Sequence, residues 1–273
     1  MAWPFLVGLV ALVVLPALAA SALAFTEFSG VQPPRFTGFE NVARLLGDEA
    51  LWRSFGNTAI YILIAVPVRL FAAVGAALLL NRHRTSSVAA RPLVYLPTVV
   101  PDVAYALLWL WLLNPLYGPA AALFGLSGTL TNPWGARVSL ALMGAFQIGE
   151  AFIVALAVRR SIPRHVYEAA AVDGATPWFT LSRLTLPLMA PMLALLALRD
   201  VILSLQVNFV PALLVTDGGP RYATTYVPLY VYRTAFRYFR LGYASTIALT
   251  MFVVTALVVY VQYRLAKRWR LAS

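Results

Sequence analysis

The chain has 273 residues, of which 61% are hydrophobic and 11% are charged, whereas soluble domains average about 45–50% and about 25%. These proportions exclude an ordinary soluble enzyme, because the apolar residues come in blocks long enough to cross a bilayer, at about 20 residues per helix. The net charge of +11 indicates membrane topology and excludes a nucleic-acid footprint, since most Arg residues flank the apolar blocks.

Six apolar blocks follow one another along the chain, and each is long enough for one membrane-spanning helix. The blocks are Trp3–Phe25, Phe55–Leu80, Leu93–Leu113, Val138–Val158, Leu186–Val215 and Tyr243–Leu265. Backbone polar groups in lipid have to be paired within helices. We therefore predict an all-α polytopic membrane protein with six transmembrane helices, forming a single domain over residues 1–273.

The first block leaves one alternative open, because Ala-rich triplets near residues 17–24 resemble a signal-peptidase site. A cleaved signal would leave five spans. However, no Lys or Arg precedes the block, and its apolar run of about 22 residues exceeds the about 7–15 residues of a signal core. We therefore expect the first helix to be retained.

The charge distribution predicts which side of the membrane each connection faces. Segments 80–92, 159–185 and 264–273 carry Lys and Arg at a higher density than the other three gaps. Positively charged connections stay on the cytoplasmic side, so we expect both termini in the cytoplasm. The Arg-rich segment Tyr226–Phe239 then falls on the external side, where we expect it to lie along the interface with snorkelling Arg side chains.

Polar residues within the spans predict a lined pathway. A charge at the bilayer centre costs at least ~2.5–3.5 kcal/mol, so such residues face a cavity or a partner. In the fifth block, helical spacing gives a stripe of Asp200, Ser204 and Asn208, with Arg199 and Gln206 on the other side. The residues predicted to line the pathway are Tyr105, Trp109, Gln147, Glu150, Asp200, Ser204, Gln206 and Asn208.

Several of these polar residues also fit a structural role. Trp109 equally suits an interfacial aromatic belt, and Asp102 and Glu150 equally suit hydrogen bonds between helices. Arg69 lies beside Pro67 in the middle of the second block. We expect its guanidinium to be satisfied by backbone carbonyls or by an acid on a neighbouring helix.

The segment Arg159–Leu184 connects the fourth and fifth blocks and is too polar to span the membrane. Pro163 suits a helix start, the following Ala-rich stretch favours a helix, and Gly174 suits the left-handed residue that ends it. Thr176 and Pro177 then open a second helix. We predict a helix, a sharp turn and another helix on the cytoplasmic face, with an amphipathic loop on lipid headgroups as the alternative.

This segment resembles a family signature. Glu168-Ala169-Ala170, then Gly174, then Leu184-x-Leu186-Pro187 is similar to the EAA-x3-G-x9-I-x-L-P motif of permease subunits in binding-protein-dependent ABC importers, with Leu184 in place of Ile. Thr216–Ser245 resembles the T-x-G-G-P…G-Y-A-S stretch of the carbohydrate branch, in the maltose-type first permease. A weaker match runs from Leu96 to Gly118.

The resemblance implies that the EAA loop, residues 159–185, is a coupling helix docked on a cytoplasmic ATPase. Small Ala side chains allow close approach, Glu168 offers a charge, and Gly174 fixes the turn. The coupling residues implied are Glu168, Ala169, Ala170, Ala171, Asp173 and Gly174. The family also implies that the permease is not an enzyme. We expect no cofactor and no metal site, because the chain has no Cys, two His and no phosphate-binding Gly-rich motif.

The family implies a set of partners and a location. The partners are a second homologous permease subunit, two ATPase subunits, an extracytoplasmic solute-binding protein, a sugar and membrane lipid. The location is the cytoplasmic (inner) membrane of a bacterium or archaeon. The external gap Thr26–Ser54 and the Thr216–Pro220 loop are the surfaces expected to dock the binding protein.

The family also implies a sugar contact at Asn208, because its members have a substrate-contacting Asn at that distance before T-x-G-G-P. Sugar hydroxyls need amide or carboxylate partners, and sugar rings stack on aromatic faces, which Gln206, Tyr105 and Trp109 offer. Arg199-Asp200 departs from the apolar character usual there. It fits an ion pair between subunits or recognition of a charged sugar.

Two alternative functions stay open from the sequence. Within the same importer class, the cargo is a glycerol phosphate instead of a sugar. In a different class, the chain is an ion-coupled secondary transporter that uses Asp102, Glu150 and Asp200 as proton or cation sites. No inverted repeat is visible, which disfavours the second alternative.

Overall fold

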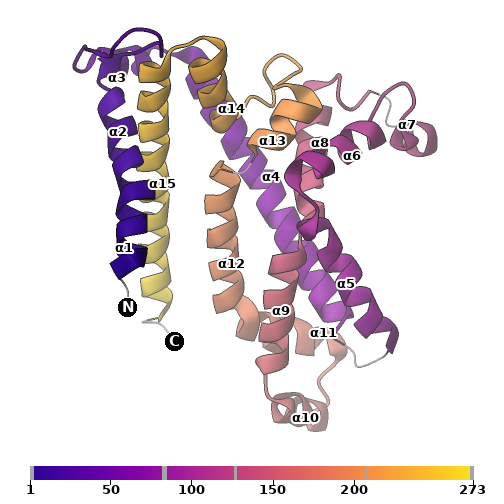
Figure 1. The fold of residues 1–273 in the computed structure, drawn as a ribbon. Helices are drawn as coiled ribbons and strands as arrows, with labels where there is room; N and C mark the ends of the chain where they lie inside the picture. Colours follow the sequence, from indigo (N-terminus) through magenta and orange to yellow (C-terminus); the bar gives the residue numbers. More distant parts are fainter. Residues whose placement is uncertain (1–2, 82–84, 126–127, 207, 271–273) are drawn as a thin grey trace. The chain divides into compact units, whose positions relative to one another are not determined.

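The computed structural model describes residues 3–81, 85–125, 128–206 and 208–270 and is mainly helical (Figure 1). Within the described residues, one short antiparallel sheet pairs β1 (Thr26–Glu27) with β2 (Arg35–Phe36). The predicted all-α class is confirmed. The chain packs as two compact units, Met1–Thr58 with Thr225–Ser273, and Ala59–Thr224. The single domain over residues 1–273 stays a prediction.

The first unit contains the two ends of the chain. Its helices are α1 (Trp3–Leu9), α2 (Leu15–Leu23), α3 (Glu40–Leu46), the start of α4 (Glu49–Leu79), α14 (Val227–Tyr232) and α15 (Leu241–Arg270), with π-helical turns at Val10–Val14 and Arg233–Arg237. The helix α15 packs against α2 and α3 (Figure 1). The apolar core joins α3, α4, α14 and α15 through Leu45, Leu51, Val227, Tyr243 and Ile247.

A half-buried acid ties three elements of this unit together. Asp48, just before α4, accepts hydrogen bonds from Tyr230 Oη at 2.7 Å and Tyr243 Oη at 2.6 Å, and from the Leu51 amide at 3.1 Å. Burial raises the pKa of the Asp48 carboxyl, but these hydrogen bonds outweigh burial and hold the pKa below its ordinary value. The charged form of Asp48 is therefore part of the fold.

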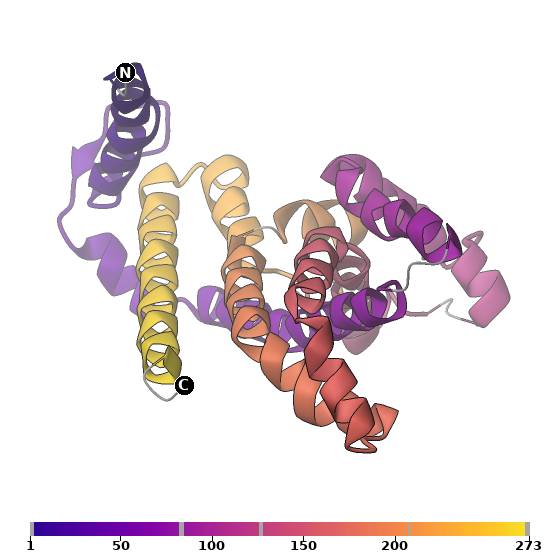
Figure 2. The same cartoon turned by 90° about the horizontal axis from the view of Figure 1, so that it is seen from below.

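The second unit holds the rest of α4 and the middle of the chain. Its helices are α5 (Thr85–Val99), α6 (Asp102–Leu112), α7 (Pro119–Phe124), α8 (Pro133–Phe146), α9 (Gly149–Ser161), α10 (Arg164–Val172), α11 (Pro177–Phe179), α12 (Leu186–Gln206) and α13 (Phe209–Pro211), with π-helical turns at Thr180–Thr185 and Ala212–Thr216. Helices α9 and α12 lie side by side (Figures 1 and 2). The apolar core of this unit joins α4, α9 and α12 and comprises Ala73, Val74, Ala77, Phe152, Ala155, Leu156 and Met189.

Two of the predicted spans are broken. A 99° bend separates α5 from α6 at Val100-Pro101, and a 50° bend separates α8 from α9. Pro101 explains the first bend, because proline lacks an amide hydrogen and its ring obstructs a continuing helix. The described residues contain four helices long and apolar enough to cross a membrane, and six spans if each bent pair counts as one. This agrees with the prediction of six.

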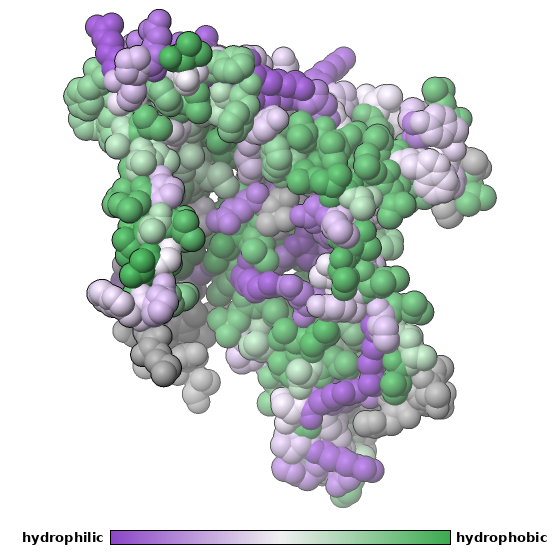
Figure 3. Space-filling view, viewed as in Figure 1, coloured by the Kyte–Doolittle hydropathy of each residue, from purple (hydrophilic) through white to green (hydrophobic). Residues whose placement is uncertain are grey.

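The boundaries of the remaining spans differ modestly from those predicted. Continuous helix runs over Trp3–Leu23, over α4 from Glu49, and over α15 from Leu241. The fifth block was expected to continue to Val215, but α12 ends at Gln206 and shorter turns follow. In the first unit, hydrophilic side chains gather at the end that holds α3, and the flank of α15 is mainly hydrophobic, as expected beside lipid (Figure 3).

The segment around α14 differs from the interfacial helix expected over Tyr226–Phe239. Tyr226 and Arg233 are buried within the first unit, with relative exposures of 1% and 8%. The apolar side chains of Phe236, Tyr238 and Phe239 remain largely exposed. Part of the segment is therefore a core element, and the expectation of a snorkelling side chain does not hold for the buried Arg233, while the position along the membrane interface stays a prediction.

Candidate functional site

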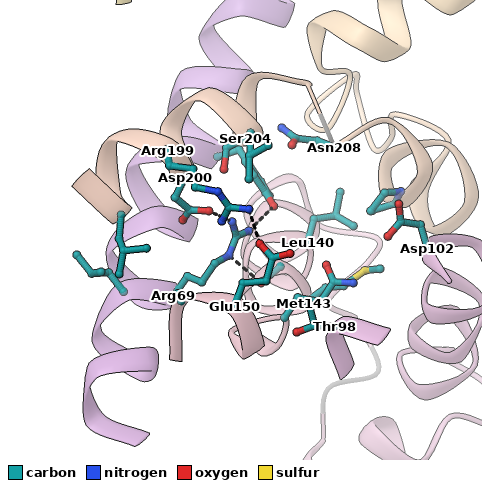
Figure 4. Close-up of a pocket in the computed structure, with 18 of the residues that line it drawn as sticks. Arg69, Thr98, Asp102, Leu140, Met143, Glu150, Arg199, Asp200, Ser204 and Asn208 are labelled. Carbon is teal, nitrogen blue, oxygen red and sulfur yellow. Dashed lines mark hydrogen bonds and ion pairs between the residues drawn. The ribbon is translucent and has the colours of Figure 1, made fainter. Parts of the chain in front are cut away.

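A cavity of about 270 Å³ opens within the second unit (Figure 4). This volume is just below the ~300–1,000 Å³ typical of ligand pockets. Its walls come from α4, α5, α6, α8, α9 and α12. The polar residues that line it are Tyr61, Arg69, Thr98, Asp102, Tyr105, Gln147, Glu150, Arg199, Asp200, Ser204 and Asn208.

Most of the residues predicted to line a pathway meet in this cavity. The cavity brings together Tyr105, Gln147, Glu150, Asp200, Ser204 and Asn208. Gln206 is exposed and Trp109 packs edge-on against the rings of Tyr105 and Phe146, and neither belongs to the lining. Tyr105 uses its hydroxyl within the fold, donating to the Met143 carbonyl at 2.8 Å.

Arg69 is held by the two kinds of partner expected for it. Its Nε donates to the Gly144 carbonyl at 3.0 Å, and its guanidinium pairs with Asp200 on α12. Both side chains are 16% exposed. Gly144 leaves room for this arrangement, because a Cβ there would lie 2.8 Å from Arg69 Nη2 and 2.5 Å from Tyr61 Oη. The interpretation of Arg69 as satisfied by a carbonyl and a neighbouring acid is confirmed.

Arg199 also finds its partner within the chain. Its guanidinium pairs with Glu150 on α9, and both side chains are about half exposed. Arg199 and Asp200 are therefore each paired inside this chain, and the ion pair between subunits stays a prediction. Both residues line the cavity, although Arg199 was expected on the other side of the helix. Glu150 has the interhelical role considered for it.

Two buried polar groups face the cavity without a hydrogen-bond partner among the described residues. They are Ser204 Oγ and Asn208 Nδ2, on side chains that are 2% and 4% exposed. An unsatisfied buried group costs about 1–3 kcal/mol. Asn208 lies at the turn between α12 and α13, directly before the first residue of α13. A ligand with hydroxyl groups would satisfy both groups.

The two helix breaks lie at the cavity wall. Thr98 precedes the first break and Asp102 follows it, and Gln147 sits at the second break with Glu150 just after it. Irregular backbone inside a membrane is tolerated where it lines a cavity. Thr98 Oγ1 accepts the first amide of α9, from Gly149, at 3.0 Å. The breaks therefore place polar side chains around one space.

Sequence reasoning missed Tyr61 and Thr98. Tyr61 lies eight residues before Arg69 on α4, a spacing that places both on one helical face. Thr98 comes directly after Pro97 and shortly before the bend that the structure shows at Pro101. The spacing of Tyr61 from Arg69 and the place of Thr98 beside Pro97 were visible in the sequence. Both residues lie in apolar stretches, so neither was chosen as a lining residue. Within the described residues, no three His, Asp or Glu lie close enough to hold a metal ion.

The segment between α9 and α12 has the predicted helix, turn and second helix. The helix α10 runs over Arg164–Val172, and Gly174 follows it with φ at +74°, the left-handed conformation expected of it. The Ala175 amide closes the turn by donating to the Ala170 carbonyl at 2.9 Å. Thr176 Oγ1 then caps α11, accepting from the Phe179 amide at 3.3 Å.

The helix α10 is fixed to its unit at one face and exposed at the other. Tyr167 lies under the Arg159 guanidinium at 4.3 Å, and its hydroxyl is 3.2 Å from Thr185 Oγ1. Ala170 is buried, so it does not offer the free surface expected of it, whereas Ala169 and Ala171 are exposed. The remaining predicted residues Glu168, Asp173 and Gly174 are exposed too, and Glu168 pairs with Arg164 at 3.0 Å.

Comparison with known proteins identifies relatives of the whole chain. The family model described as "Binding-protein-dependent transport system inner membrane component" matches residues 69–271. The probable ABC transporter permease protein YesP of Bacillus subtilis is 32% identical, over 97% of this chain and 89% of its own. The lactose transport system permease protein LacF of Rhizobium radiobacter is 28% identical, over 97% and 93%.

A solved structure of an ABC transporter also resembles this chain. A bacterial alginate ABC transporter, in complex with an alginate pentasaccharide-bound periplasmic protein, contains a chain that matches with a TM-score of 0.84 at 25% identity. The match covers 98% of this chain and 93% of that chain.

Proposed function

This chain belongs to the family of inner membrane components of binding-protein-dependent transport systems, and we propose that it is the permease subunit of an ATP-driven carbohydrate importer. It lies in the inner membrane and is not an enzyme. The observation that carries the proposal is α10, a short exposed helix closed by a left-handed glycine and anchored at its base. An element of this kind suits a rigid handle for a separate motor.

The coupling residues are the exposed side chains of this handle. In the proposed mechanism, Glu168, Ala169, Ala171, Asp173 and Gly174 contact a cytoplasmic ATPase, and closure of two ATPase subunits moves α10. Because Tyr167 and Thr185 join α10 to the base of α12, the motion is passed to the helices that line the cavity. Ala170 contributes by packing α10 against its own unit.

The cavity is the part of the translocation pathway that this chain contributes. Asn208 and Ser204 bind sugar hydroxyl groups, because each presents a buried polar atom without a partner among the described residues. Gln147 and Asp102 add an amide and a carboxylate from other parts of the cavity lining. Trp109 supports the wall through Tyr105, and Gln206 lies outside it.

The proposed assembly follows from the family and its relatives. LacF is named as a lactose transport system permease protein, and the matching structure is an alginate ABC transporter in complex with a periplasmic protein. We therefore assign to this chain a second permease subunit, two ATPase subunits and an extracytoplasmic solute-binding protein. Both termini and α10 lie on the cytoplasmic side, where the density of Arg and Lys is higher.

Uptake into proteoliposomes tests the proposal. The chain is reconstituted with its partner permease, ATPase and binding protein, and uptake of radiolabelled disaccharides is followed with ATP inside. We expect uptake that requires ATP and persists in a protonophore. Uptake that survives without ATP but collapses with the protonophore would identify an ion-coupled transporter instead.

A further inference from the structure

We infer that the cavity of this subunit accepts uncharged sugar units and rejects anionic ones, because every positive centre on its wall is already matched by a carboxylate of the same chain. The inference deepens the proposed function and rests on it. It names the class of cargo that α4, α6, α9 and α12 admit.

The two guanidinium groups on the wall are both occupied. Arg69 pairs with Asp200, and Arg199 pairs with Glu150 (Figure 4). Within the part of the chain that the structure describes, no other Lys, Arg or His lines the cavity. An anionic sugar needs a bidentate Arg or a Lys to replace the water around its charge. Because each guanidinium charge is already compensated by a carboxylate, an anion that used the remaining N–H groups would bring an unbalanced negative charge to the wall.

The positive N-termini of the two helices that begin at the wall also have an acidic side chain beside them. The N-terminus of a helix carries about half a positive charge, which favours an anion. However, α6 begins with Asp102, and α9 has Glu150 in its first turn. The two guanidinium groups and the two helix ends together balance the three carboxylates, so the wall is close to neutral. A carboxylate or phosphate on the cargo would therefore gain little.

The polar groups that remain without partners suit neutral hydroxyls. Ser204 Oγ and Asn208 Nδ2 are buried, face the cavity and have no hydrogen-bond partner among the described residues. Sugar hydroxyls both donate and accept, so they satisfy a serine hydroxyl and an amide NH2 without bringing a charge. This donor set differs from what an acidic polysaccharide requires, although the fold resembles that of an alginate transporter.

The experiment measures equilibrium binding of radiolabelled disaccharides to the transporter complex in nanodiscs, without the binding protein. The probes are lactose, maltose and cellobiose, each beside the matched disaccharide in which C6 of the non-reducing sugar is oxidised to a carboxylate. We expect at least one neutral probe to bind, and its carboxylate counterpart to bind at least about tenfold more weakly.

Substitutions then test the cause. Glu150→Gln releases the Arg199 guanidinium. The ratio of the affinity for the neutral probe to the affinity for the anionic probe should therefore fall about tenfold. Glu150→Asp keeps the charge and should preserve the ratio. Glu49→Gln makes the same charge change on an exposed residue outside the cavity and should also preserve it.

Equal or tighter binding of the anionic probe by the unaltered complex would overturn the inference but not the proposed function. An unchanged ratio of neutral to anionic affinity in Glu150→Gln would do the same. So would ATP-driven uptake of a neutral sugar by a complex that binds none of the neutral probes in nanodiscs. Absence of ATP-driven uptake for every probe would instead count against the proposed function.

Discussion

The ion pair between Arg69 and Asp200 allows a sharp test of how the cavity wall is held together. Replacing Asp200 with Leu leaves a guanidinium that is 16% exposed with one carbonyl contact, from Gly144, and without its carboxylate. Removing one partner of a buried pair costs about 3–5 kcal/mol, because an uncompensated charge stays in a low-dielectric site. We therefore expect Asp200→Leu to lower the free energy of unfolding by roughly this amount.

The pair between Arg199 and Glu150 provides the matched comparison. Its side chains are 51% and 53% exposed, so water screens the charges. Glu150→Leu should cost only about 0–1 kcal/mol. The double variant Arg69→Met with Asp200→Leu removes both charges and should recover most of the stability lost in Asp200→Leu, since no charge is then left unpaired.

The assay is thermal and denaturant unfolding of the purified protein in one detergent, with the unaltered protein and the three variants measured side by side. We predict that Asp200→Leu lowers the free energy of unfolding most. The double variant should lower it much less, and Glu150→Leu should lower it least. Equal losses for Asp200→Leu and Glu150→Leu would refute the reasoning, because burial would then make no difference. A double variant no more stable than Asp200→Leu would also refute it.

Three further predictions concern the ligand groups, the turn and the half-buried acid. Asn208→Leu removes a buried donor that has no partner among the described residues, so sugar uptake should fall while the melting temperature stays equal or rises; a fall in stability with unchanged uptake would contradict this. Gly174→Val forces a β-branched residue to φ near +74° and should uncouple ATP hydrolysis from uptake, whereas Gly174→Asn should retain coupling; equal coupling in both variants would remove the role of the turn. Because the pKa of Asp48 is depressed below 3.8, its contribution to stability is present above that pH and is lost as the pH falls through its lower folded value. Asp48→Asn should therefore lose stability at neutral pH and converge with the unaltered protein in acid, as followed by unfolding at stepped pH; a constant difference across the pH range would exclude this explanation.

Periodicity and turn chemistry were enough to predict the helices and the exposed loop. Blocks of about 20 apolar residues predict spans because lipid forces the backbone into helices. In the loop, Gly174 and Thr176 carry local conformational preferences that do not depend on distant contacts, so α10 and the start of α11 were predicted closely. Ala170 could not be placed, because its burial depends on packing outside the loop.

The cavity was less predictable, because it is made by contacts between distant helices. Helical spacing placed Asp200, Ser204 and Asn208 on one face, but it did not reveal that Arg69 reaches Asp200 across 131 positions of sequence. The sharp bend at Pro101 was not foreseen either, since proline inside a membrane helix is compatible with a kink or a full break. Partner choice among charges is a tertiary property that spacing alone does not determine.

Site-directed cross-linking at α10 tests the account's central claim most directly. The chain has no Cys, so Ala171→Cys introduces a single thiol at an exposed position of the handle. We predict that this thiol, labelled with a maleimide that carries a photoreactive group, cross-links to the ATPase subunit on illumination of membrane vesicles, and that the yield changes when ATP is added. The same thiol placed by Val31→Cys, on an exposed residue of the first unit between β1 and β2, should give no such product. Labelling of Ala171→Cys from the external side, or failure to cross-link in a complex that transports, would contradict the account.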